Sequence, residues 1–375
     1  MRWLSFVILV VAVAAQAKPN TLHSKILNED RTWRVRLPAG YEVSGEKYPV
    51  LYLLDGQTHF EHVAGSAGYL MDQGEIPQMI IVALDSTVRV RDFTPTDWPQ
   101  AWIGGGGAAK FREFLSREFI PEIEKTLRTD GYRVLAGHSA SGQFALYTLE
   151  SEPQLFQGYI ALSASLDWDN RLPARGLSAA FDKKPDLHAF AFVARCNDSG
   201  SALEDFNQLV EVFKTKAPSG LRWKSQAYDL ETHGSVALVG MIDALRALYA
   251  GWRVPEDLTA KGLPAVEAYF ATLSKTYGRP VPLTETVVND LAYQALEKKQ
   301  NADAIALFQR NVTAHPGSAN ALDGLADGLA ADGQTAAAIV AQEKAVRLAK
   351  QSASPQLPQL EKHLKKLKAS KPAAP

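Results

Sequence analysis

The sequence predicts an α/β fold with a mainly parallel central sheet, followed by a small all-helical unit. Short β-rich runs alternate with helical patterns through the first two thirds of the chain, as in sheets covered by helices on both faces. Several of these runs are apolar throughout, which suits strands buried on both sides. After about Trp252 the strand-like runs stop and alanine-rich helical patterns replace them.

Residues 1–17 have the pattern of a cleavable secretory signal peptide. Arg2 gives a positive start, residues 4–15 are almost all apolar, and Ala15-Gln16-Ala17 is an A-x-A cleavage site. We therefore expect a mature chain that begins near Lys18 and is periplasmic or secreted. An uncleaved anchor is the alternative. No later segment approaches the roughly 20 apolar residues of a membrane helix.

The strands are expected in the apolar runs at 31–37, 49–54, 79–84, 132–136, 158–162, 188–194 and 222–230. Residues 18–252 would form this α/β domain. Between two of the runs, apolar residues recur at helical spacing from Phe111 to Leu127 and predict an amphipathic helix. Pro121 should kink or restart that helix.

Composition excludes several classes of function. The chain has 40 basic and 41 acidic residues, so it lacks the basic surface that nucleic acid binding needs. Cys196 is the single cysteine, which rules out an internal disulfide. No CxxC or HExxH motif indicates zinc. The glycines at 104–107 are not followed by Gly-Lys-Ser/Thr, so they predict a flexible loop and no phosphate site.

The segment 137–142 predicts a nucleophile elbow. Ser139 follows an apolar strand and precedes a helical pattern, with Gly137 and Ala140 beside it. This strand–turn–helix context is typical of the α/β-hydrolase fold, where it lifts a serine hydroxyl above the sheet. Ser141 replaces the usual second glycine. The alternative is an ordinary crossover turn with an incidental serine.

A serine nucleophile needs a base, and the base a partner that orients it. In hydrolases of this kind the chain order is Ser, then Asp or Glu, then His. Of the eight histidines, His233 alone follows the last predicted strand and precedes a helix. We expect His233 to be the base, with a surface histidine that caps a loop as the alternative.

The sequence offers three alternatives for the acid. Asp198 lies on the loop after the strand at 188–194, ahead of a helix that begins near Ser201. Glu204 and Asp205 are rivals, although acidic residues in a first helical turn also favour the helix dipole. A Ser–His pair without a carboxylate is the third possibility.

Backbone amides are expected to form the oxyanion hole. Ala140 follows the nucleophile directly, and its N–H lies at a helix start. The second donor normally comes from the loop after an early strand, where Asp55-Gly56-Gln57 makes the Gln57 N–H the candidate. An ordinary Asp-Gly turn is the alternative there.

The helical unit carries an internal repeat. Residues 253–285 read as a helical connection, 286–350 as two tetratricopeptide-like repeats, and 351–375 as a capping helix with a flexible tail. Leu291 matches Leu325 and Ile305 matches Ile339 at an offset of 34, the period of that repeat. Because two copies are too few for independent stability, we expect them to pack on the α/β core or on another chain. A generic helical hairpin is the alternative.

Residues 20–250 resemble the putative-esterase family of α/β-hydrolases, which includes enterochelin and bacillibactin trilactone esterases. The resemblance rests on segments 21–29, 47–56, 91–96 and 231–235 together with the elbow. It implies Ser139 as nucleophile, His233 as base and the Gln57 and Ala140 amides as the oxyanion hole. Its acid position, commonly a glutamate, corresponds to Asp198. Members of this family carry no cofactor.

The sequence therefore predicts an exported serine esterase that acts on a small-molecule ester. A siderophore trilactone is one candidate substrate, and Arg89 and Arg91 on the loop after the strand at 79–84 could face its negative charge. A carbohydrate-linked acyl group or a small aliphatic ester stays open. The alternative function is a catalytically idle core that holds a protein partner, or a second copy of the chain, through its helical repeats.

Overall fold

The structure is a computed structural model that describes residues 19–99, 104–184, 186–255, 257–352 and 354–370. The predicted signal peptide lies outside these residues. Within the described ranges, no helix has both the length and the apolar character to cross a bilayer.

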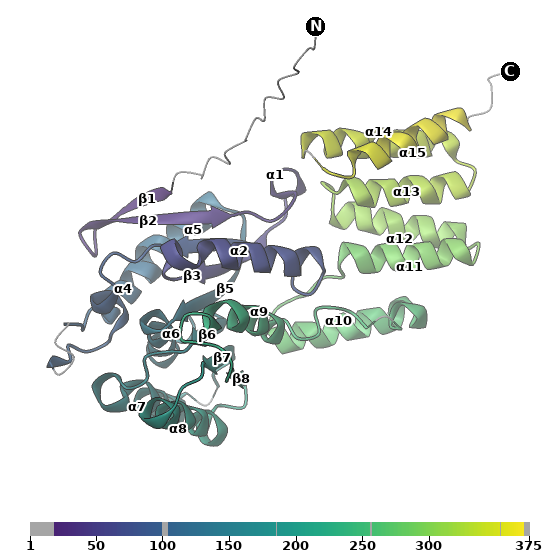
Figure 1. The fold of residues 1–375 in the computed structure, drawn as a ribbon. Helices are drawn as coiled ribbons and strands as arrows, with labels where there is room; N and C mark the ends of the chain where they lie inside the picture. The colour runs from purple at the N-terminus through teal and green to yellow at the C-terminus, as the bar shows by residue number, and fades with distance from the viewer. Residues whose placement is uncertain (1–18, 100–103, 185, 256, 353, 371–375) are drawn as a thin grey trace, which may run out of the picture.

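The core is a twisted, mostly parallel sheet in the order β1-β2-β4-β3-β5-β6-β7-β8 (Figure 1). β1 and β4 each pair with β2 in the antiparallel direction, and the remaining pairs are parallel. This confirms the predicted fold class. The strands are β1 (Asn20–Ser24), β2 (Glu29–Arg36), β3 (Tyr48–Leu53), β4 (Ile80–Leu84), β5 (Thr129–His138), β6 (Gly158–Leu162), β7 (Ala189–Arg195) and β8 (Leu221–Ala227).

β1 was not among the predicted strands. It lies at the edge of the sheet and is mostly exposed, so its sequence carries no apolar run or alternation. Its pairing with β2 comes from backbone hydrogen bonds, for which side-chain patterns give no signal.

Helices cover both faces of the sheet (Figure 1). One face packs against α4 (Ala108–Phe114), α5 (Ile120–Thr126), α6 (Ala140–Ser151), α7 (Trp168–Lys183) and α8 (Gly200–Lys216). The other packs against α2 (Gly56–Asp72), α9 (Val236–Leu248) and α10 (Leu263–Tyr277). A single π-helical turn, η2 (Leu115–Phe119), joins α4 to α5, and Pro121 stands in the first turn of α5. Phe119 and Ile120 keep helical backbone angles, so the helix continues through Pro121 and does not restart there; the change in helix geometry is the π-helical turn directly before it. Short elements α1 (Tyr41–Ser44), α3 (Arg89–Phe93) and η3 (Thr259–Lys261) complete this part.

The C-terminal part is a stack of helices: α11 (Glu285–Glu297), α12 (Asn301–Ala314), α13 (Ala319–Ala331), α14 (Thr335–Gln351) and α15 (Leu357–Ala369). α11 and α13 begin 34 residues apart, and so do α12 and α14. The sequence repeat thus corresponds to a repeated pair of helices. Their assignment as tetratricopeptide repeats stays a prediction, as do the domain boundaries.

The helical stack packs directly on the α/β core. Val287 and Leu291 of α11 belong to the same buried cluster as the strands and α9. At the loop between α12 and α13, Gly317 lies so close to α1 that an added Cβ would overlap the Val43 carbonyl oxygen. His315 contacts Glu46 beside it, with 2.6 Å between Nδ1 and Oε1. The expectation that this unit packs on the core is therefore met by the structure.

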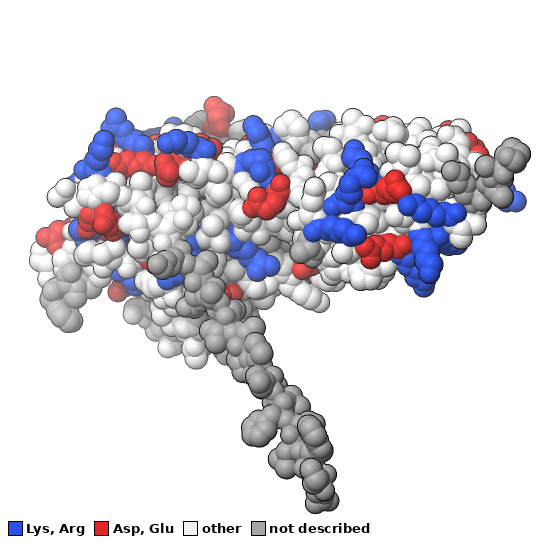
Figure 2. Space-filling model, turned by 90° about the horizontal axis from the view of Figure 1, so that it is seen from above, with Lys and Arg blue, Asp and Glu red and all other residues white. Residues whose placement is uncertain are grey.

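Charges of both signs are interspersed over the face that carries α14 and α15 (Figure 2). Two ion pairs join these helices, Lys350 with Glu361 at 2.9 Å and Lys368 with Glu343 at 2.7 Å. Exposed pairs of this kind contribute little stability each, so apolar contacts hold α15 in place.

Candidate active site

Ser139 lies at a sharp turn between β5 and α6. Its backbone has φ 60° and ψ −121°, a conformation that L residues rarely adopt. Gly137 is required two residues earlier, because an added Cβ there would overlap the carbonyl of Ser141. Backbone strain of this kind is kept where the surrounding structure enforces it, as at nucleophile elbows.

Ser141, which replaces the expected glycine, ties this turn to its neighbour in the sheet. Its hydroxyl oxygen accepts the N–H of His138 at 2.9 Å and lies 2.6 Å from a carboxylate oxygen of Asp55. Asp55 ends the turn between β3 and α2. The departure from the usual motif therefore supplies a link between two loops of the site.

Asp55 is a buried carboxylate, 3% exposed, whose partners all belong to the loops around the elbow. Oδ1 accepts from Ser86 Oγ at 2.7 Å and from Arg89 Nε at 2.9 Å, while Oδ2 faces Ser141. Arg89 also donates to the carbonyl oxygen of His138 at 3.0 Å. This network fixes the loop after β3 relative to the nucleophile turn.

The two proposed oxyanion donors lie at helix starts over neighbouring strands. Gln57 is in the first turn of α2 after β3, and Ala140 is the first residue of α6 after β5. Amides in a first helical turn have no acceptor within the helix, so they are available to an anion. The Gln57 side chain accepts the N–H of Ser86 at 2.9 Å, which anchors this turn.

His233 lies on the exposed loop between β8 and α9. Its carbonyl oxygen accepts from Nε2 of His138 at 2.5 Å, and the two rings are 4.6 Å apart between centroids. The loop of the predicted base therefore contacts the residue that precedes the predicted nucleophile, Ser139. Within the described part of the chain, no hydrogen bond joins the Ser139 hydroxyl to the His233 ring; such pairs often tighten only when substrate binds.

One ring nitrogen of His233, Nδ1, faces a serine. Nδ1 is 3.1 Å from Oγ of Ser163, the residue that follows β6. Asp198 contacts Cys196 instead, with 3.1 Å between Oδ1 and Sγ. Among the described residues, then, Asp198 does not bond His233 directly, and two side chains stand between them.

The rival acids have a different partner. Arg171 of α7 contacts Asp205 at 2.5 Å and Glu204 at 3.6 Å. Both carboxylates lie in the first turns of α8, as predicted, and neither contacts the His233 loop. Their placement supports a structural role in joining α7 to α8.

Comparisons with known proteins identify the family and the fold. The family described as Putative esterase matches residues 24–204. An IroE-like serine hydrolase from Shewanella oneidensis is 30% identical, with a TM-score of 0.68 over 75% of this chain and 94% of that one. The chain belongs to the Putative esterase family.

Two further proteins are similar to this member of the esterase family. Ferri-bacillibactin esterase BesA from Bacillus subtilis is 33% identical over 174 residues, which cover 38% of this chain and 56% of BesA. The match thus spans little more than half of that relative. An uncharacterised protein from Capnocytophaga ochracea, 17% identical with a TM-score of 0.61, covers 94% of this chain and shares its fold. The family is thus related to siderophore esterases.

The sequence did not point to Ser163. It is a buried polar residue at the carboxyl end of β6, a strand that is otherwise apolar and lies next to the nucleophile strand. Ligands and catalytic groups gather at the carboxyl ends of parallel strands. A polar residue that ends an apolar strand was therefore the available signal.

The two arginines suggested for substrate binding are both engaged with carboxylates. Arg91 pairs with Glu29 at 2.6 Å and with Asp92 at 2.7 Å, which leaves its charge largely compensated. The Arg91 hydrogen bond is the main reason why the pKa of Glu29 lies below its usual value. Arg89 is held by Asp55 beside the elbow, and its side chain is 38% exposed. Of the two, Arg89 is the one placed at the site.

Three histidines fill the space beneath the elbow. His59 Nδ1 is 2.9 Å from His62 Nε2, and the rings of His59 and His138 are 5.4 Å apart. They line a cavity of about 10 Å³, close to the minimum space for one water. Burial lowers the pKa of His138 to about 4 and also lowers the pKa values of His59 and His62. These rings are neutral near pH 7.

His138 makes the free energy of unfolding depend on pH between about pH 4 and pH 6.5. Its folded pKa of about 4 is below the unfolded value of 6.5, so the unfolded state binds more protons between these values. Its contribution to stability is complete above pH 6.5 and is lost as the pH falls toward 4. From pH 7.5 to pH 5 we expect His138 to account for a loss of about 2 kcal/mol in unfolding free energy, and His138→Gln should remove that part of the loss.

Urea unfolding of both proteins at the two pH values measures this difference. His59 and His62 are present in both proteins, so their contributions to the pH dependence of the unfolding free energy cancel when the two proteins are compared. An equal loss in wild type and variant would show that His138 is not the group responsible.

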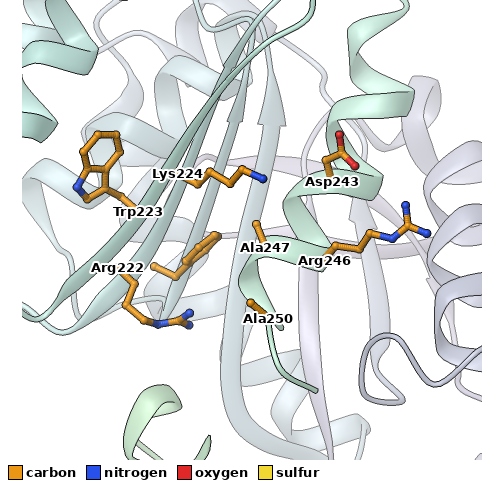
Figure 3. Close-up of a pocket in the computed structure, with 8 residues that line it drawn as sticks. Arg222, Trp223, Lys224, Asp243, Arg246, Ala247 and Ala250 are labelled. Atoms are coloured by element: carbon orange, nitrogen blue, oxygen red, sulfur yellow. The ribbon is translucent and has the colours of Figure 1, made fainter. Parts of the chain in front are cut away.

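A groove of about 490 Å³ lies elsewhere, against the edge strand β8 and α9 (Figure 3). Lys224 extends across it toward Asp243, whereas Arg246 points away from it (Figure 3) and pairs with Glu75. Its residues on β8 come from the amino half of the strand, away from the loop that carries His233. The groove shares no lining residue with the elbow.

Asp323, Asp327 and His363 form a group with metal-ligand spacing within the described residues. Both ring nitrogens of His363 face carboxylates, Nδ1 at 2.7 Å from Asp323 and Nε2 at 3.3 Å from Asp327. A histidine whose two ring nitrogens both face carboxylates links the helices that carry them, here α13 and α15. We assign the group that structural role.

Proposed function

We propose that this chain is an exported serine esterase that hydrolyses carboxylic esters through an acyl-enzyme, with Ser139 as nucleophile, His233 as base and Asp198 as the acid. The observation that carries the proposal is the strained turn at Ser139, with the His233 loop hydrogen-bonded to the residue before it. Membership of the esterase family supports the reaction class.

In the first half-reaction the Ser139 hydroxyl attacks the ester carbonyl carbon while Nε2 of His233 takes its proton. The carbonyl oxygen becomes an oxyanion, which the Gln57 and Ala140 amides would stabilise. Losing one such donor in a comparable site costs about 3–4 kcal/mol of transition-state stabilisation. The network around Asp55 holds the two amides in register, because it joins their loops.

His233 then returns the proton to the leaving alcohol, and an acyl group stays on Ser139. A water oxygen then attacks the acyl carbon while His233 takes one of its protons; the bond from this carbon to Ser139 Oγ breaks, His233 returns the proton to Oγ, and the acid product leaves. Each half-reaction needs Nε2 unprotonated at its start. The proton on the imidazole must therefore be held at Nδ1.

A siderophore trilactone is the substrate class that we favour. BesA is a ferri-bacillibactin esterase by its printed name, and that relative is 33% identical over the matched segment. A ferric catecholate of this kind is an anion. Arg89 lies beside the elbow with part of its side chain exposed, where it could meet such a charge.

Active-site labelling tests the proposal directly. We expect a fluorophosphonate probe to modify the purified mature chain once, on Ser139, as located by mass spectrometry of the peptides. p-Nitrophenyl acetate should be hydrolysed until the label is complete, and a panel of esters that includes trilactones should then rank the substrates. A protein that neither takes the label nor turns over any ester would favour the scaffold function instead.

A further inference from the structure

Among the described residues, Asp198, the carboxylate expected to orient His233, contacts Cys196 rather than the His233 ring. We propose that Asp198 orients His233 through two intervening side chains, Cys196 and Ser163, which form a one-way chain of hydrogen bonds. This inference rests on the proposed esterase function, since it assigns the residues that position its base.

The four groups are in consecutive contact. His233 Nδ1 is 3.1 Å from Ser163 Oγ, Ser163 Oγ is 3.4 Å from Cys196 Sγ, and Cys196 Sγ is 3.1 Å from Asp198 Oδ1. The two middle groups are shielded from water, since Ser163 is 6% exposed and Cys196 is 2% exposed. Buried polar groups need partners, and these two find them in each other and in the end groups.

The protons of this chain can point in one direction. Nδ1–H of His233 donates to Ser163, the Ser163 hydroxyl donates to the Cys196 sulfur, and the Cys196 thiol donates to the Asp198 carboxylate. Each middle group then donates once and accepts once, within the capacity of a hydroxyl and a thiol. Burial raises the pKa of the Cys196 thiol, which keeps the proton that this arrangement needs.

This direction sets the tautomer of the base. With its proton held at Nδ1, His233 presents an unprotonated Nε2 to the Ser139 hydroxyl. When Nε2 takes the serine proton, the imidazolium charge is stabilised through the chain toward Asp198, and no proton moves along it. Hydrogen bonds in such chains polarise one another.

The fold places Ser163 between the elbow and the base loop. The Ser139 N–H donates to the carbonyl of Leu162, and the Ser163 N–H donates to the carbonyl of Ala194. The loop after β7 is joined to the base loop in turn, because the Asn197 N–H donates to the Glu231 carbonyl at 2.9 Å. Acid, intermediary and base are therefore tied to three neighbouring strand ends.

Ser163 has a φ of 40°, in the left-handed region that favours glycine. Serine is less favourable than glycine in this backbone conformation, so the group that serine adds at this position is its hydroxyl. This makes Ser163→Gly a discriminating variant: glycine fits the backbone at least as well but lacks the hydroxyl. A purely structural role for Ser163 would leave activity intact in that variant.

We expect Ser163→Gly to fold normally, as judged by circular dichroism and urea unfolding, and to lose about 10- to 100-fold in kcat with little change in KM. Cys196→Ala should show a similar loss, and Cys196→Ser, whose hydroxyl can still relay, a smaller one. Asp198→Asn should match Ser163→Gly, and the double variant should be no worse than either, because the residues act as one unit. Ser151→Ala, at the exposed end of α6, is the matched control and should keep wild-type activity.

A readout independent of turnover comes from NMR of the His233 ring nitrogens, which reports the tautomer. The proton should be held at Nδ1 in the wild type, and Ser163→Gly and Asp198→Asn should lose this preference to the same extent. The His138 ring, 4.6 Å away, and Glu231 on the same loop are unchanged in every variant. Wild-type activity with an unchanged His233 tautomer in Ser163→Gly overturns the chain.

Two further outcomes separate this inference from the function on which it rests. If Asp198→Asn loses activity while the Ser163 and Cys196 variants do not, Asp198 reaches His233 directly and the intermediaries are wrong. If the wild-type protein takes no fluorophosphonate label and hydrolyses no ester, the proposed function fails. The NMR measurement of the His233 tautomer still decides in that case whether the three residues are linked to His233.

Discussion

Ser139→Ala is expected to lower kcat for p-nitrophenyl acetate at least about 1,000-fold, because the other hydroxyl of the elbow, on Ser141, is buried and bonded to Asp55. The side chain is small and its backbone conformation is set by the neighbours, so the variant should fold with the stability of the wild type. His233→Ala should cause a loss of similar size. The double variant should be no slower than either single one, since nucleophile and base fail together.

Ser151→Ala is the matched control for this measurement. It removes a hydroxyl from the last turn of α6, where its partner is the carbonyl oxygen of Tyr147 in the same helix. Turnover in Ser139→Ala equal to that in Ser151→Ala would contradict the assignment of the nucleophile. Residual hydrolysis near the uncatalysed rate is the outcome that supports it.

Gly137→Ala should cost at least about 2–3 kcal/mol of unfolding free energy and lower kcat/KM about 100-fold or more. A Cβ at this position would overlap the Ser141 carbonyl, which is backbone and cannot rotate away. The turn must open to admit the methyl group, and that displaces both Ser139 and the link from Ser141 to Asp55. Urea unfolding and steady-state kinetics measure the two effects.

Gly65→Ala separates this effect from the general cost of replacing glycine. Gly65 is in α2, its φ is not left-handed, and a Cβ there would meet nothing within 4 Å. Alanine should therefore leave activity unchanged and raise stability by up to about 1 kcal/mol. If Gly137→Ala behaves like Gly65→Ala, the turn at Ser139 is not constrained as described.

The sequence allowed the sheet and the elbow to be predicted because both depend on local patterns. Buried parallel strands are apolar throughout, and the turn at Ser139 demands a small residue at position 137 whatever surrounds it. The position of His233, on the loop between the last strand and the next helix, could be predicted from chain order alone. Such features are encoded within a few neighbouring residues.

Contacts between distant loops could not be predicted in this way. Ser163 and Asp198 are 35 positions apart, and nothing in either segment shows that Cys196 lies between them. Arg91 has no sequence signal for its pairing with Glu29, which is 62 positions away. Edge strand β1 was missed because its side chains face solvent and carry no pattern.

The packing of the helical stack on the sheet also determines how the molecule unfolds on heating. Residues of α10 and α11 belong to the same buried apolar cluster as α2, α9 and the strands, so the sheet and the helical stack share one interior. Separating the stack from the sheet would expose Phe270, Val287 and Leu291 together with the strands that they cover. The two parts should therefore unfold together in a single cooperative thermal transition.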